Sequence, residues 1–94
     1  MIRYLLITRR RVPLEMKEEY ARLWSAVRAV AEKLSARAWI FESAHVGGFY
    51  TEFVEWKSLP SDLLIDRAEA SSALDDLNTI FIAEEAAVWS EAQI

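Results

Sequence analysis

The residues of this chain that could carry proton-transfer chemistry gather in one stretch, Ala38 to Trp56. His45 is the only histidine, and its imidazole titrates near neutral pH, so it could act as a general base. Tyr50 and Glu52 follow on the far side of Gly47-Gly48, the only two glycines. A carboxylate could orient the imidazole, and a phenol could donate a hydrogen bond to a substrate oxygen. His45, Tyr50 and Glu52 are therefore the candidate catalytic residues, although a partly exposed histidine near a turn is the simpler interpretation.

These side chains meet only if the stretch folds as a β-hairpin with a tight turn. Two runs of aromatic and β-branched residues flank the glycine pair, and a type I′ turn needs the positive φ that glycine accepts. A two-residue turn predicts the cross-strand pairs Val46–Phe49, His45–Tyr50, Ser43–Glu52, Phe41–Val54 and Trp39–Trp56. Because side chains alternate across a strand, one face then carries His45 and the aromatic set Trp39, Phe41, Val54 and Trp56. This set is the predicted wall of a pocket for a flat hydrophobic ligand, with core or dimer interface as the simpler alternative.

Other chemistry has weaker support in the sequence. Arg9, Arg10 and Arg11 could bind a carboxylate or phosphate, but a solvated turn is the simpler interpretation. One histidine, no cysteine and scattered carboxylates give no metal-ligand spacing, so we expect neither a metal nor a cofactor. The net charge of −4 argues against nucleic acid, because phosphate binding needs a clustered basic surface.

The elements that position these residues follow from the spacing of apolar side chains. Ile2–Thr8 is apolar on both faces and predicts a central strand. Leu14–Ala36 repeats apolar residues at three and four positions, which predicts an amphipathic helix. The hairpin follows, and Leu63–Leu77 predicts a second helix. The last stretch alternates from Ala87 to Gln93, which favours a closing strand, while its good helix formers leave a terminal helix as the alternative.

The order strand, helix, strand, strand, helix, strand predicts a single α+β domain over residues 1–94. It is typical of the ferredoxin-like βαββαβ fold, a four-stranded antiparallel sheet with both helices on one face. Hydrophobic residues make up 53% of the chain, which is high for so small a domain. The uncovered face of the sheet would place a large apolar patch in water. We therefore expect a homodimer that packs sheet against sheet.

Taken together, these features resemble the dimeric α/β-barrel superfamily, in particular antibiotic-biosynthesis-monooxygenase-like and related uncharacterised small proteins. The resemblance covers nearly the whole chain and includes the N-terminal strand, the aromatic hairpin and the late Val88-Trp89-Ser90-Glu91. It implies ferredoxin-like domains whose sheets pack face to face. Oxygenases of this group tend to use an asparagine near the pocket. The only asparagine here, Asn78, falls at the expected end of the second helix, so no catalytic asparagine is carried over.

The sequence favours a small homodimeric ligand-binding protein with an apolar pocket for a hydrophobic or aromatic ligand. The alternative is a cofactor-independent monooxygenase or isomerase that acts on an aromatic or polyketide-like substrate, with His45 as general base. Whether the protein is an enzyme stays open at this point. No apolar run approaches the roughly 18 to 20 residues of a membrane span, and Met1 leads directly into a strand. We therefore expect no membrane partner and a cytoplasmic location.

Overall fold

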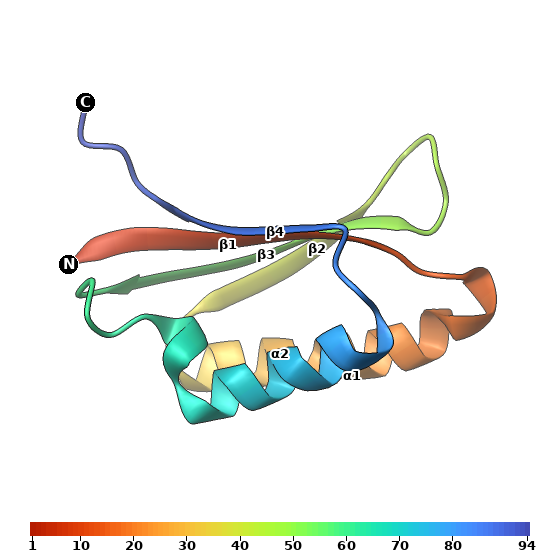
Figure 1. Cartoon of the computed structure of the whole chain (residues 1–94), viewed down its shortest axis with the longest axis horizontal. Coiled ribbons are helices and arrows are strands. Elements are labelled where there is room, and N and C mark those ends of the chain that lie inside the picture. Colours follow the sequence, from red (N-terminus) through yellow and green to blue (C-terminus); the bar gives the residue numbers. More distant parts are fainter.

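The chain folds into two layers, a β-sheet with helices packed on one side (Figure 1). The computed structural model describes all residues, 1–94. Four antiparallel strands lie in the order β2-β3-β1-β4, namely β1 (Ile2–Arg11), β2 (Arg37–Glu42), β3 (Phe49–Ser58) and β4 (Glu85–Ser90). The helices are α1 (Lys17–Lys33) and α2 (Ala68–Ile80), which follow the short 3₁₀ turns η1 (Leu14–Met16) and η2 (Leu64–Asp66). The predicted ferredoxin-like βαββαβ arrangement is confirmed, and the C-terminal element is a strand.

We call the face of the sheet that α1 and α2 cover the inner face, and the opposite one the outer face. The core lies between the inner face and the helices. The stripe predicted from the helical spacing supplies the contribution of α1, and its buried members are Tyr20, Leu23, Trp24, Val27 and Ala31. The helix ends before the predicted Ala36 because Ser35 takes a left-handed φ of 61°, which lets the N–H of Ala36 reach the carbonyl of Ala31 at 2.8 Å.

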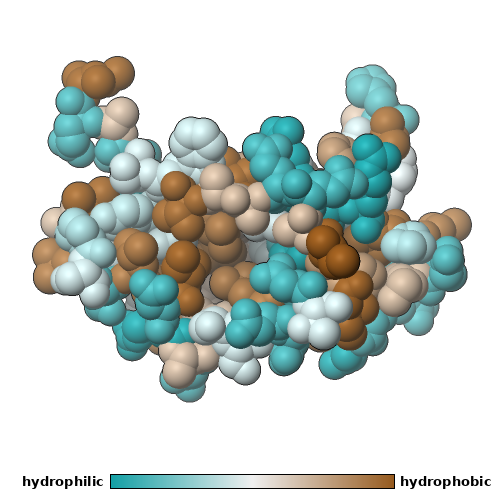
Figure 2. All heavy atoms as spheres, viewed as in Figure 1, coloured by the Kyte–Doolittle hydropathy of each residue, from teal (hydrophilic) through white to brown (hydrophobic).

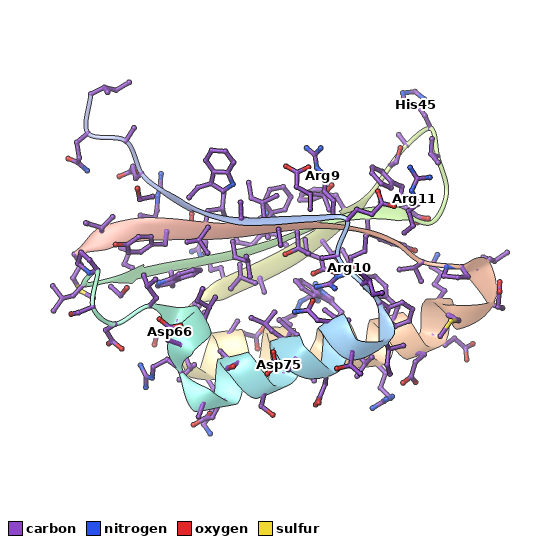
Figure 3. The ribbon with its side chains drawn as sticks, viewed as in Figure 1. Arg9, Arg10, Arg11, His45, Asp66 and Asp75 are labelled. Carbon is purple, nitrogen blue, oxygen red and sulfur yellow. The ribbon has the colours of Figure 1, made fainter.

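The strand β1 continues through the arginines instead of ending at Thr8. It pairs with β3 over its whole length, from Ile2 opposite Ser58 to Arg11 opposite Phe49. Side chains alternate along it, so Arg10 points to the inner face while Arg9 and Arg11 point to the outer face (Figure 3). The interpretation of the three arginines as a solvated turn is therefore wrong, because they lie in a strand and Arg10 is buried.

The predicted hairpin exists, but its register is wrong. Trp39 lies opposite Phe53 instead of Trp56, and Glu42 lies opposite Tyr50. The connection is a six-residue loop, residues 43–48, and only Gly48 has a positive φ, 81°. A side chain at Gly48 would meet the carbonyl oxygen of Val12 at 2.7 Å, so glycine is required there. The register moves by three residues, an odd number, which exchanges the two faces of β2 relative to β3.

Polar side chains of the loop explain why the tight turn does not form. The hydroxyl of Ser43 accepts hydrogen bonds from the N–H groups of His45 and Val46, at 3.2 and 3.0 Å. The carboxylate of Glu42 accepts one from the N–H of Gly48 at 2.9 Å. These contacts satisfy backbone donors inside a longer loop, as side chains of serine and acidic residues often do in turns.

Candidate ligand-binding cleft

A cleft of about 370 Å³ lies between the inner face of the sheet and α2. Its sheet side carries Leu6, Thr8 and Arg10 of β1, which are two residues apart and therefore point the same way. In Figure 2 apolar side chains gather between the edge of the sheet that carries β4 and the helix α2. The remaining lining residues come from η2, α2 and the segment that leads into β4: Ile65, Ser71, Leu74, Asp75, Asn78, Ile82, Ala83 and Ala86.

Arg10 is the most unusual residue of the cleft, because an arginine is almost never buried without partners. Its side chain is only 1% exposed. The Nε atom donates to Glu52 Oε2 at 2.6 Å, and Nη1 donates to Asn78 Oδ1 at 2.7 Å and to the carbonyl of Phe81 at 2.5 Å. These partners come from β3, from α2 and from the residue after α2, so the guanidinium is fixed from three directions. Figure 3 shows Arg10 directed from the sheet toward the helices.

A tyrosine completes the network. The hydroxyl of Tyr20 in α1 donates to the same Glu52 oxygen at 2.5 Å. Burial, and next the negative charge of Glu52, raise the pKa of Tyr20 well above its usual value. The rings of Tyr50 and Phe81 pack on Tyr20, with ring centroids 4.9 and 5.3 Å away. Glu52 therefore holds a neutral phenol and a charged guanidinium together in a dry environment.

Two hydrogen-bonding groups on the sheet side of the cleft remain unused. Nη2 of Arg10 makes no hydrogen bond within the chain, and neither does the hydroxyl of Thr8, which is 3% exposed. The one fully buried side-chain polar atom without a partner is Nε1 of Trp24, so these two groups are not sealed off from the cleft, and an external acceptor could reach them. Leu6 lies four residues before Arg10, about 13 Å along the strand. The cleft thus has a polar end at Arg10 and Thr8 and an apolar end at Leu6.

The structure does not bring the predicted catalytic residues together. Tyr50 and Glu52 both lie on the inner face, where they are 7% and 2% exposed. Burial, and next the charge of Glu42, raise the pKa of Tyr50. His45 is exposed in the loop between β2 and β3, on the other side of the sheet from Arg10 (Figure 3). The pairing of His45 with Tyr50 rested on the two-residue turn, and it fails with that turn because Glu42 takes the place opposite Tyr50.

The predicted aromatic wall is divided between the two faces for the same reason. Val54 and Trp56 lie in the core, and Trp56 stacks on Tyr4 with ring centroids 5.6 Å apart. Trp39 and Phe41 lie on the outer face, where both pack on Phe53 at 6.2 and 5.7 Å. The expectation that these four residues share one face is therefore wrong.

Sequence-based interpretation missed Thr8 and Asn78, which line the cleft, and Tyr20, which donates to Glu52, and it considered Arg10 only as one of three arginines at a turn. Alternation along β1 could have found Thr8 and Arg10, because a strand that continues to Arg11 places both on the face of Leu6. No local pattern shows that Arg10 meets Asn78, which is 68 residues away in the chain. Elsewhere, no group of three or more His, Asp or Glu side chains could hold a metal ion, and no helix is long and apolar enough to cross a membrane.

Comparison with known proteins identifies the fold. No family model matches the sequence, and no curated protein matches it. Among solved structures, a conserved protein from Methanosarcina mazei has 16% identity and a TM-score of 0.69, with 100% of this chain and 95% of the other covered. A Nitrosomonas europaea protein, provisionally named an antibiotic biosynthesis monooxygenase, has 14% identity and a TM-score of 0.70, with 98% and 90% covered.

A third similar structure, from Bacteroides fragilis, is described as a dimeric protein of unknown function with a ferredoxin-like fold. It has 13% identity and a TM-score of 0.65, with 98% of this chain and 95% of the other covered. At these identities the shared property is the fold. The resemblance predicted from the sequence is confirmed at that level: this chain has the ferredoxin-like fold of antibiotic-biosynthesis-monooxygenase-like proteins and of uncharacterised dimeric proteins.

Proposed function

We propose that this protein binds a small, largely apolar ligand in the cleft between β1 and α2, and that it does so as a homodimer. The observation that carries the binding proposal is Arg10. Three partners hold its guanidinium in place, while Nη2 and the neighbouring hydroxyl of Thr8 make no hydrogen bond within the chain. A ligand that offers an acceptor oxygen would satisfy both groups, and its apolar part would contact Leu6 and Leu74.

The charges around the cleft favour a neutral ligand. The positive charge of Arg10 is matched by Glu52 at 2.6 Å, and Asp75 adds a negative charge at the wall of the cleft. A carboxylate ligand would therefore meet more negative than unmatched positive charge. A ketone, quinone or phenol supplies the acceptor oxygen without that repulsion. The expected ligand class is an aromatic ketone or phenol, in agreement with the hydrophobic or aromatic ligand expected from the sequence.

The dimer proposal rests on the outer face. No helix covers the seven large apolar side chains of this face, namely Leu5, Ile7, Trp39, Phe41, Phe49, Phe53 and Trp89. Phe41 and Trp89 are more than half exposed, at 57% and 56%. A monomer rarely exposes an apolar patch of this kind, and a second copy would bury it by packing sheet on sheet. The Bacteroides fragilis protein, which shares the fold, is described as dimeric.

The enzymatic alternative, a cofactor-independent monooxygenase or isomerase, has the name of the Nitrosomonas europaea protein as its support. In that case the ligand of the cleft would be the substrate. His45 is not among the residues that line the cleft. A turnover that survives His45→Ala would remove His45 from the mechanism, and a turnover abolished by it would restore the original assignment.

Three matched probes test the binding proposal by NMR titration of the labelled protein. They share a naphthalene ring and differ in one group: 2-acetonaphthone has a ketone, 2-naphthoate a carboxylate and 2-ethylnaphthalene no oxygen. We expect 2-acetonaphthone to bind tightest, with shifts at Leu6, Thr8 and Leu74. Thr8→Val removes the free hydroxyl at constant volume and should weaken the ketone about tenfold, with no loss of stability. Equal affinity for 2-acetonaphthone and 2-ethylnaphthalene would contradict the role of Arg10 and Thr8.

A further inference from the structure

A second concave surface, which we call the basic depression, lies at the end of the sheet where β1 begins and β3 ends, on the left in Figure 1. It has a volume of about 650 Å³, within the range of small-molecule sites. The buried side chains of Trp56 and Leu64 contribute its apolar wall. It shares no lining residue with the cleft beside Arg10, so the two are separate sites.

The unpaired cations of the protein concentrate in this depression. The chain has eleven Lys and Arg residues, and seven of them form ion pairs with carboxylates. The four without an ion pair are Arg28, Arg37, Lys57 and Arg67, and the last three all line the basic depression. In a chain with fifteen acidic residues and a net charge of −4, partners for cations are plentiful. Three unpaired cations in one concave surface therefore indicate an external anion.

The three cations come from separate elements, and the backbone of each is fixed by strand pairing or by hydrogen bonds. Arg37 is the first residue of β2 and lies opposite Glu55 of β3 in the sheet, without an ion pair between them. Lys57 lies in β3 opposite Arg3 of β1. Arg67 joins η2 to α2. Its N–H donates to the carbonyl of Leu64 at 3.0 Å, and its carbonyl accepts from the N–H of Ser71 at 2.8 Å. Arg37 and Lys57 extend from the outer face at the end of the sheet, and Arg67 lies on the side of the helices. A ligand held by all three would therefore lie across the end of the sheet.

The acidic residues of the depression define the charge of the ligand. Glu55 and Asp62 also line it, together with a fourth cation, Arg3, which forms an ion pair with Glu91 and lies 3.9 Å from Glu55. The three cations without an ion pair outnumber the two acidic side chains, and each can donate to a different oxygen of one ligand, which favours an anion with several acceptor oxygens. Guanidinium groups recognise phosphate and carboxylate oxygens through paired hydrogen bonds.

We propose that the basic depression binds a small multivalent oxyanion, a phosphate ester or a polycarboxylate. Asp62, which has no ion pair, limits its affinity by repulsion, and Arg37, Lys57 and Arg67 supply the attraction. This site would take a charged ligand, in contrast to the neutral ligand expected in the cleft.

The test is an NMR titration at low ionic strength with pyrophosphate, citrate and, as a monoanion control, acetate. We expect saturable shifts around Arg37, Lys57 and Arg67, with pyrophosphate or citrate at least about tenfold tighter than acetate. Pyrophosphate binding alone would point to a phosphate ester, and citrate binding alone would point to a polycarboxylate. No saturable binding of either would overturn the proposal.

Single substitutions assign the binding to named residues. Lys57→Gln and Arg67→Gln should each weaken the bound anion about five- to tenfold, and Asp62→Asn should tighten it. Arg28→Gln is the matched control, because it removes an unpaired cation outside the depression and should change nothing. All four side chains are exposed, so the fold should persist, which a thermal melt would verify. An equal loss in Arg28→Gln, or an unchanged affinity in both Lys57→Gln and Arg67→Gln, would overturn the proposal.

Discussion

Three successive arginines of β1 differ in exposure and in their partners, depending on the face of the sheet from which they extend. Arg9 and Arg11 point to the outer face, are more than half exposed, and pair with the exposed carboxylates of Glu85 and Glu84. Arg10 points to the inner face, is 1% exposed, and is fixed by Glu52, Asn78 and the carbonyl of Phe81. A surface ion pair contributes little because water screens it, whereas a buried charge must keep its partners. The two faces therefore differ in whether water reaches the arginine side chain and its partner.

This contrast also separates two tasks. The inner face offers a rigid donor beside an apolar cleft, which suits recognition of a small ligand. The outer face offers stacked aromatic side chains and adaptable surface charges, which suit association with a second copy. Under the proposed function, neighbouring residues in one strand serve different functions, and pairs of adjacent substitutions can distinguish them.

The largest effect should come from placing a lysine on either face of β3. Val54 is 3% exposed in the core, so Val54→Lys would bury an unpaired ammonium and should prevent folding. Phe53 lies on the outer face, so Phe53→Lys should give a folded monomer with a mass near 10.8 kDa. Circular dichroism and light scattering would separate the two results. A folded Val54→Lys protein, or an undissociated Phe53→Lys dimer, would contradict the assignment of the faces.

The next largest effect on stability should come from breaking the ion pair on the inner face, compared with one on the outer face. Glu52→Gln leaves the buried guanidinium of Arg10 without its counter-charge and should lower the free energy of unfolding by about 3–5 kcal/mol. Glu85→Gln breaks the exposed pair with Arg9 and should cost at most about 1 kcal/mol. Urea unfolding would measure both. The double variant Arg10→Met/Glu52→Leu should be more stable than Glu52→Gln, because it leaves no unpaired charge buried. Similar losses of unfolding free energy in Glu52→Gln and Glu85→Gln would contradict the difference between the buried and the exposed ion pair.

A smaller effect concerns Tyr20 and pH. Tyr20→Phe removes the hydrogen bond to Glu52 and should cost about 1–2 kcal/mol. Because folding raises the pKa of Tyr20, the unfolded chain loses this proton first as the pH rises. The stabilisation from Tyr20 is therefore complete below its unfolded pKa of about 10 and declines above it. Between pH 8 and 11, the free energy of unfolding should fall more steeply for the wild type than for Tyr20→Phe. Parallel curves for the two proteins would contradict the raised pKa of Tyr20.

The sequence was sufficient for the element order because apolar spacing is local. The stripe from Tyr20 to Ala31 and the alternation near Trp89 are visible without any tertiary contact. The register of the hairpin was not predictable from Gly47-Gly48 alone, since the hydroxyl of Ser43 and the carboxylate of Glu42 stabilise a longer loop. An error of three residues then placed the predicted site on two different faces.

The buried arginine shows a different limit. A run of three arginines normally indicates solvent, and the choice of Arg10 for burial depends on partners 42 and 68 residues away, Glu52 and Asn78. Only the fold brings these groups to one place. The predicted residue Glu52 does not line the cleft, and it is instead the counter-charge of Arg10 and the acceptor of Tyr20.

The measurement that tests the central claim most directly is the affinity of 2-acetonaphthone for two adjacent variants of β4. Ala86 lines the cleft on the inner face, and Ala87 lies on the outer face opposite Ile7. Ala86→Leu fills the cleft and should weaken the ketone at least about tenfold, whereas Ala87→Leu should leave its affinity unchanged. If Ala87→Leu weakens binding and Ala86→Leu does not, the ligand site lies on the outer face and the proposed division of tasks is wrong.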